Sequence, residues 1–116
     1  DAGTPTISDP GRRLVEGVLK LGLRAIPIPG PSALTTSLSV SGIKADNFLF
    51  LGFPPAKKGR ASFFKKIAAS PYAVVLYESP HRLLKTLHEL SSVLGERREV
   101  VVFPFVPVSL ISQTLF

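Results

Sequence analysis

The chain contains no cysteine, and its two histidines have no cluster of acidic residues beside them. The first absence excludes disulfide bonds, thiolate catalysis and cysteine-ligated zinc, and the second argues against a metal site of another kind. No apolar run approaches the ~20 residues that span a bilayer, and no signal peptide is recognisable. These absences predict a cytoplasmic protein without a metal or a membrane segment.

Acidic residues are also scarce in the middle of the chain, which concentrates its positive charge. The 116 residues carry a formal net charge of +6, and no aspartate or glutamate occurs between Asn47 and Tyr77. Within this window the stretch "KKGRASFFKK" contains Lys57, Lys58, Arg60, Lys65 and Lys66. A basic patch with two phenylalanines can bind a phosphate backbone, but a solvated helix face over a core has the same pattern. The sequence alone leaves both interpretations open.

The common catalytic spacings are absent as well. There is no G-x-G-x-x-G, no P-loop and no G-x-S-x-G elbow, which disfavours hydride transfer, phosphoryl transfer and serine hydrolysis. His81 and His88 are seven residues apart, whereas a metal-binding pair on a helix prefers a spacing of about four. His81, at a helix start, is the better functional candidate, and we expect His88 to lie on the surface.

Strand and helix patterns alternate along the chain, and 45% of its residues are hydrophobic, enough for a packed core. The first helix is predicted to have Asp9 as its cap, Pro10 in its first turn and Gly22 as its stop. Further helices are predicted near 31–42 and at 59–70 and 80–95, and strands at 23–29, 47–53, 73–79 and 98–103. The alternation predicts an α/β fold with a largely parallel or mixed sheet.

Three loops would follow strands of this sheet, at the edge where open α/β sheets collect ligands. They are "DAGTPTISDPG", "PIPGPSA" and "YESPHR". The same residue types are common in ordinary turns and at the starts of helices, so any one of these loops alone would be weak evidence for a site. In the third loop, Arg82 could contact a carboxylate or a phosphate.

Four motifs together resemble a known family. They are "DAGTPTISDPGRRLV", "PIPGPSALTTSLSVSG", "FLFLGFPPAKKGR" and "LYESPHRLLKTLHEL". Their order and spacing are similar to those of the ribosomal small-subunit RNA methyltransferase I family, which has the tetrapyrrole-methylase fold. The resemblance covers roughly residues 1 to 103. It implies methyl transfer from S-adenosylmethionine to the 2′-oxygen of a cytidine ribose in small-subunit (16S) ribosomal RNA.

The same resemblance implies two α/β domains with the cofactor between them. Residues 1–44 would be the end of the first domain and residues 45–116 most of a truncated second one. The residues themselves favour the segment "GIKADN" at 42–47, which separates the first two predicted helices from the rest, as the linker. The chain is then expected to be incomplete at both ends, and the intact protein to be a homodimer. From about residue 104 the tail "PFVPVSLISQTLF" departs from the family, and we expect it to be exposed and to favour association.

The resemblance also implies site residues, which are assigned from each of the four motifs in turn. Cofactor binding is implied for Asp1, Ala2, Gly3, Thr4, Pro5, Ser32, Ala33, Glu78 and Ser79, and RNA binding for Lys57, Lys58, Arg60 and Arg82. No general base for the ribose hydroxyl is assigned, and Glu78 and His81 are the candidates. Two alternatives stay open, a related methylase of a small molecule such as a tetrapyrrole and a non-catalytic RNA-binding or dimerising remnant.

Overall fold

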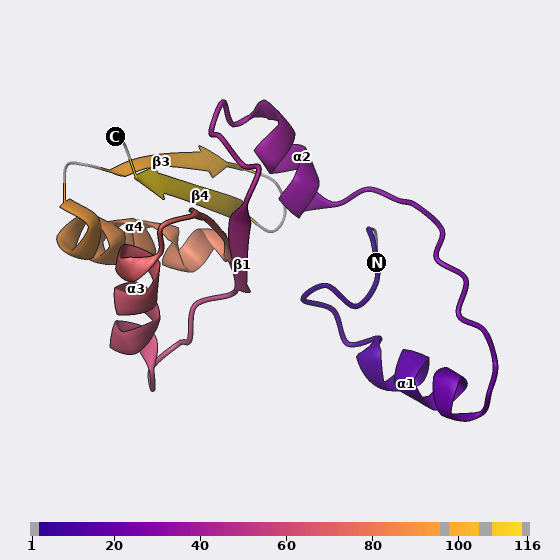
Figure 1. Ribbon diagram of the computed structural model, residues 1–116. Helices are drawn as coiled ribbons and strands as arrows, with labels where there is room; N and C mark the ends of the chain where they lie inside the picture. Colours follow the sequence, from indigo (N-terminus) through magenta and orange to yellow (C-terminus); the bar gives the residue numbers. More distant parts are fainter. Residues whose placement is uncertain (1–2, 96–97, 105–107, 115–116) are drawn as a thin grey trace. The chain divides into compact units, whose positions relative to one another are not determined.

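The computed structural model describes residues 3–95, 98–104 and 108–114 (Figure 1). Its contacts divide the chain into an N-terminal unit, residues 1–32, and a C-terminal unit, residues 33–116. This division falls earlier in the chain than the boundary expected after residue 44. The assignment of the two domains stays a prediction, and each unit is described by itself.

In the N-terminal unit, the residues from Gly3 onward form one helix, α1 (Arg12–Lys20). It ends as predicted, with Gly22 at φ 71° just beyond it, but it begins later than predicted. Gly11 is the N-cap, with no side-chain cap, because the Asp9 carboxylate instead accepts a hydrogen bond from the Thr6 N–H at 3.3 Å. The expected capping role of Asp9 is therefore wrong.

The strand predicted at 23–29 is also wrong, since no strand occurs among the described residues of the N-terminal unit. Pro27 and Pro29 have no N–H to donate to a ladder. Moreover, no other described segment of this unit is paired with this one. The segment is exposed, Ile26 and Ile28 at more than four-fifths of their surface.

The described residues of the C-terminal unit form seven elements. They are α2 (Ala33–Val40), β1 (Phe48–Gly52), α3 (Arg60–Ala69), β2 (Ala73–Glu78), α4 (Pro80–Leu94), β3 (Arg98–Phe103) and β4 (Val108–Thr114). The strand order is β1-β2-β4-β3, with β1 and β2 parallel and β4 antiparallel to both its neighbours. The predicted α/β fold with a mixed sheet is confirmed, as are the elements predicted between residues 31 and 103.

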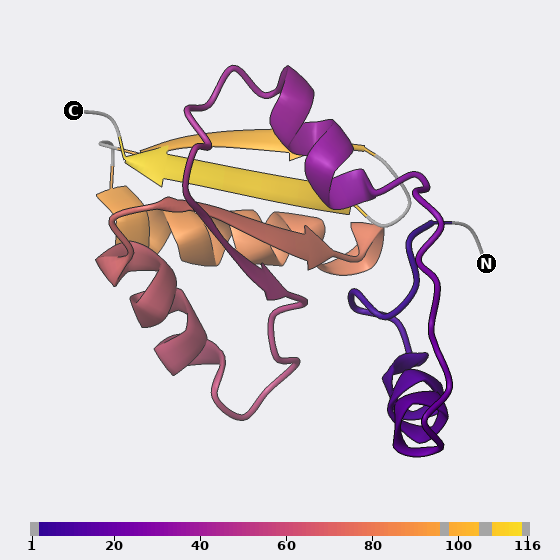
Figure 2. The same cartoon turned by 45° about the vertical axis from the view of Figure 1, so that its right-hand side comes forward.

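The core lies on both faces of β2, all of whose residues are buried. Alternate residues of a strand point to opposite faces. Val74 and Leu76 pack in one cluster with side chains of α3 and α4, among them Ile67 and Leu90. The odd-numbered residues Ala73 and Val75 pack in a second cluster, which α2 covers, and Figure 2 shows α2 on the opposite side of the sheet from α3 and α4.

The tail of the chain contains a strand that was not predicted from the sequence. Residues 108–114 form β4, whose backbone pairs with residues 74–78 of β2 and with all of β3. The expected exposure of the tail falls on side chains outside those that the structure describes. An antiparallel partner closes the edge of β2 that would otherwise present unpaired N–H and C=O groups. Within the described residues, no helix is long and apolar enough to cross a membrane.

Candidate functional site

Two of the motifs meet inside the N-terminal unit. The Thr4 N–H donates to the carbonyl of Pro31 at 2.9 Å, and the Thr4 hydroxyl donates to the carbonyls of Pro31 and Gly30 at 3.3 and 3.4 Å. Gly3 has φ +111°, and a Cβ there would lie 3.3 Å from the Pro31 oxygen. The first loop thus needs glycine at position 3 to approach the second loop this closely.

The first loop is strained just beyond this contact. Thr6 has φ 73° and Ser8 has φ 57°, a left-handed backbone that side chains other than glycine rarely adopt and that is least favourable for a β-branched residue such as threonine. Strained backbone gathers at ligand-binding segments. Gly3, Thr4 and Pro5, for which the resemblance implies cofactor binding, are all exposed, whereas Asp1 and Ala2 lie outside the described residues.

The other two motifs meet at the carboxyl ends of the parallel strands β1 and β2. Glu78, the last residue of β2, is completely buried. Its Oε1 accepts a hydrogen bond from the Ser79 N–H at 2.8 Å and forms an ion pair with Arg82 at 2.8 Å. Arg82 also donates to the Pro54 carbonyl at 3.4 Å. The loop after β1 is thereby tied to the loop after β2.

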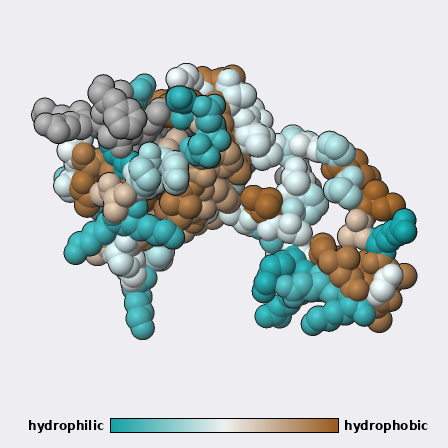
Figure 3. Space-filling model, viewed as in Figure 1, coloured by the Kyte–Doolittle hydropathy of each residue, from teal (hydrophilic) through white to brown (hydrophobic). Residues whose placement is uncertain are grey.

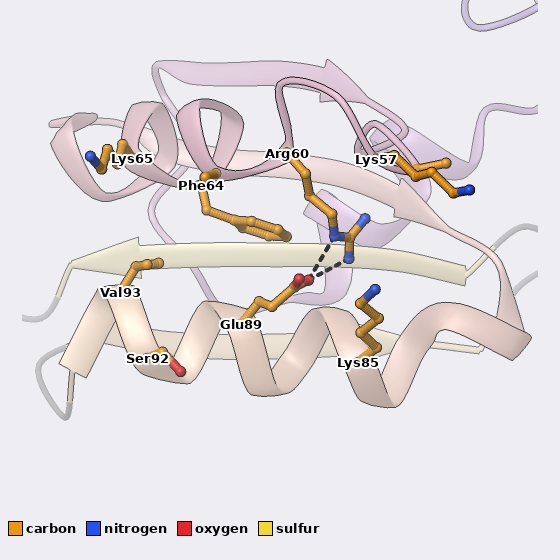
Figure 4. A pocket seen from close by; sticks show the side chains of 10 residues that line it. Lys57, Arg60, Phe64, Lys65, Lys85, Glu89, Ser92 and Val93 are labelled. Carbon is orange, nitrogen blue, oxygen red and sulfur yellow. Dashed lines mark hydrogen bonds and ion pairs between the residues drawn. The ribbon is translucent and has the colours of Figure 1, made fainter.

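A second link runs through Thr86, which is fully buried on α4. Its hydroxyl donates to Glu78 Oε2 at 2.7 Å and accepts from the Arg60 guanidinium at 2.7 Å. Arg60 also donates to the Pro55 carbonyl at 2.9 Å and pairs with Glu89 at 2.5 Å (Figure 4). The four side chains Glu78, Thr86, Arg60 and Glu89 form a continuous chain of hydrogen bonds, which we call the Thr86 network.

In the Thr86 network, Arg60 and Glu78 both have partners inside the protein. Arg60 is 7% exposed, and its guanidinium points inward to Thr86 and Glu89, where an RNA phosphate would have to displace these partners. Both carboxylate oxygens of Glu78 likewise have partners inside the protein. Hydrogen bonding from Arg60 holds the pKa of Glu89 below its usual value, so this carboxylate stays ionised.

The remaining implied residues of the C-terminal unit lie nearer the solvent. Lys57, Lys58 and His81 are exposed, and so is His88, as expected. Arg82 is half-buried, with about a third of its side chain exposed. Thr86 was not among the residues predicted from the sequence. Arg82, Thr86 and Glu89 nevertheless stand at i, i+4 and i+7 on one face of α4, a spacing that predicts neighbouring side chains.

Aromatic rings border the same strand ends. The ring of Tyr77 packs edge-on against Phe50, with centroids 5.1 Å apart, and lies 5.6 Å from the ring of Phe53. Burial raises the pKa of the Tyr77 hydroxyl, and a hydrogen bond from the Leu34 backbone opposes this effect. Leu34 is in the first turn of α2, so the helix that begins at Ala33 is anchored to the end of β2.

Comparisons with known proteins agree with the motifs. A sequence profile of the tetrapyrrole (corrin/porphyrin) methylases matches residues 1–104. A ribosomal RNA small subunit methyltransferase I from Escherichia coli O157:H7 is 50% identical over 103 residues, 88% of this chain and 36% of the relative. The Pseudomonas aeruginosa protein of the same name is 46% identical over the same shares. The Thermotoga maritima protein is 43% identical over 84% of this chain and 44% of its own length.

The chain therefore spans about a third of the length of its first relatives. The resemblance inferred from the four motifs is confirmed, since these relatives carry the name of that methyltransferase family. The match to the profile covers most of the chain, and the chain belongs to the tetrapyrrole methylase family.

Proposed function

We propose that the chain is part of an S-adenosylmethionine-dependent methyltransferase that modifies the 2′-oxygen of a cytidine ribose in small-subunit ribosomal RNA. A cytoplasmic location follows from this substrate, and we include the homodimer that the resemblance implies. The observation that carries the proposal is the direct hydrogen bonding between paired motifs, Thr4 with Pro31 in one unit and Arg82 with Pro54 in the other. The similarity to relatives named for this RNA supports the substrate.

The exposed loop around Gly3, Thr4 and Pro5 fits a cofactor of this chemistry. The cofactor supplies a methyl group on a sulfonium cation, and it also carries an amino group, a carboxylate and an adenine. Thr4 holds the loop against Gly30 and Pro31, which precede Ser32 in the chain. Taken by itself, the N-terminal turn of α2, which begins at Ala33, favours a carboxylate through its amide dipoles.

In the C-terminal unit, some of the implied site residues hold loops in place and others would contact the RNA. Glu78 and Arg60 hold the loops after β2 and β1 in place through the Thr86 network, and Ser79 shares the bonding of Glu78. Lys57, Lys58 and Arg82 are the proposed RNA contacts. Of the two candidate bases we favour His81, since it is exposed at the start of α4, whereas the Glu78 carboxylate is fully engaged. An enzyme of this kind mainly supplies alignment and exclusion of water.

The first test is titration of the 116-residue chain with S-adenosylmethionine by calorimetry. We expect saturable binding that Gly3→Ala weakens at least ~10-fold, because the added Cβ would push the loop away from Pro31, and a loss of 1.4 kcal/mol corresponds to that factor. Gly22→Ala is the matched control. Gly22 also has a positive φ, but a Cβ there would meet nothing within 4 Å.

Both variants place alanine at a positive φ, although φ +111° at Gly3 is less favourable for alanine than φ +71° at Gly22. A larger loss of binding by Gly3→Ala than by Gly22→Ala therefore reports on the first loop, through its backbone and its approach to Pro31. Transfer of a labelled methyl group to the ribose of small-subunit RNA would then separate this function from methylation of a small molecule. A folded chain that binds no cofactor, or equal weakening by both variants, would refute the proposed site.

A further inference from the structure

A groove of about 530 Å³ lies between α3 and α4 (Figure 4). It lies beside the Thr86 network and includes residues to which neither the motifs nor the comparisons assign a role. Side chains of three segments line it, namely the loop before α3, α3 itself and α4. Its interior and its rim differ in charge, and this difference points to a ligand class.

The interior of the groove is electrically balanced. Arg60 pairs with Glu89 at 2.5 Å, and its guanidinium also lies 5.0 Å above the ring of the buried Phe64. The lowered pKa of Glu89 keeps the carboxylate charged at neutral pH. A bound anion would therefore gain little from Arg60, whose charge already has a partner.

The rim carries three further cations. Lys57, Lys65 and Lys85 are exposed, and in the described part of the chain none of them has an ion-pair partner within 4.0 Å. Lys85 is near enough to Glu89 to contribute to its lowered pKa. In Figure 4, Lys57 and Lys85 lie towards the end of the groove where α3 begins, and Lys65 and Val93 lie towards the other end.

We propose that this groove binds the phosphodiester backbone of an RNA strand, with Lys57, Lys65 and Lys85 each beside a phosphate. The cations are spread along the groove, whereas a single phosphate would need donors that converge on one point. The apolar wall provided by Ala61 and Val93 suits riboses lying between the phosphates. This inference rests on the proposed RNA substrate, and it adds Lys65 and Lys85 to the contact surface.

The test compares two variants of the full chain that lose the same number of lysines. The groove variant is K57Q/K65Q/K85Q. The control variant is K20Q/K44Q/K66Q, whose lysines are exposed but do not line the groove. Binding of a fluorescently labelled single-stranded RNA is followed by anisotropy over a series of KCl concentrations, and circular dichroism verifies that both variants fold.

We expect the groove variant to lower the slope of log K against log[KCl] by about 2, because each neutralised phosphate contributes about 0.7 for a single strand. The control variant should lower it clearly less. An equal decrease of the slope in the two variants would mean that RNA binding depends only on the net charge, which would overturn the inference. The absence of RNA binding by the parent chain would overturn it as well. Inorganic phosphate that competes at micromolar concentration would overturn it too, in favour of a small anion.

The groove and the proposed cofactor site can fail separately. Both lysine variants should titrate with S-adenosylmethionine like the parent chain, since none of the six lysines is in the loops assigned to the cofactor. Loss of cofactor binding with the expected salt slopes would refute the proposed function and leave the groove standing. Normal cofactor binding, together with equal salt slopes of RNA binding in the two variants, would refute the groove and leave the proposed function standing.

Discussion

Thr86 joins two charged residues that come from different parts of the chain. Its single hydroxyl donates to Glu78 and accepts from Arg60 in a fully buried position. The hydroxyl therefore satisfies one oxygen of a carboxylate and one N–H of a guanidinium at the same time. Buried polar groups that lose their only partner cost about 1–3 kcal/mol each, and more when they are charged.

Thr86→Val tests this role, because valine has nearly the same shape but neither donates nor accepts. We expect the free energy of unfolding, measured in urea, to fall by about 2–3 kcal/mol. Thr36→Val is the control, since Thr36 is exposed on α2 and surface changes of this kind stay within about 0.5 kcal/mol. If the two variants had the same stability, the Thr86 network would not be stabilising the C-terminal unit.

At the candidate site, the sequence motifs mark segments that touch one another, but they do not predict the direction of the side chains. The pattern around Glu78, Arg82 and Arg60 correctly marks loops that meet at the strand ends. Whether a charged side chain in such a loop faces solvent or the interior depends on the partners that the fold brings to it. Arg60 turns inward because Thr86 and Glu89 of α4 lie beside it, and the motif that contains Arg60 says nothing about them.

Among the described elements, β4 is the one that was not predicted from the sequence. Pro104 and Pro107 interrupt the apolar tail, and prolines are typical of segments outside a strand. Yet its backbone lies between β2 and β3 in the sheet. At residues 23–29 the opposite occurs, because a strand was predicted and none forms. An apolar run with prolines at 27 and 29 forms no hydrogen-bonded ladder without a partner strand.

Ile111→Pro tests the position of β4. Residue 111 is paired with Val75 on one side and with Val101 on the other, and proline in a central strand removes a ladder hydrogen bond. We expect the free energy of unfolding to fall by about 1–3 kcal/mol, the usual cost of a buried backbone group left without its partner, seen as a lower urea midpoint. Lys58→Pro, at an exposed residue of the loop between β1 and α3, should lower the midpoint far less, and an equal effect would mean that β4 adds nothing to the sheet.

The whole molecule distributes its stability unevenly. Every buried residue in the described part of the chain belongs to the C-terminal unit, from Ser37 on α2 to Leu90 on α4. In the N-terminal unit, Leu14 on α1 is 74% exposed, and the described ion pair of that helix, Arg12 with Glu16, is exposed as well. Exposed pairs of this kind contribute only about 0–1 kcal/mol.

Removal of residues 1–32 is therefore expected to leave the C-terminal unit folded, with a urea midpoint close to that of the full chain. The slope of the unfolding free energy against urea concentration depends on the surface that unfolding exposes. Because the buried core lies in the C-terminal unit, this slope should hardly change. The shortened chain should keep the salt dependence of RNA binding assigned to the groove, since all three of its lysines remain, but it should lose S-adenosylmethionine binding together with the loop around Gly3 and Thr4. A large fall in the midpoint would instead mean that the N-terminal unit stabilises the sheet.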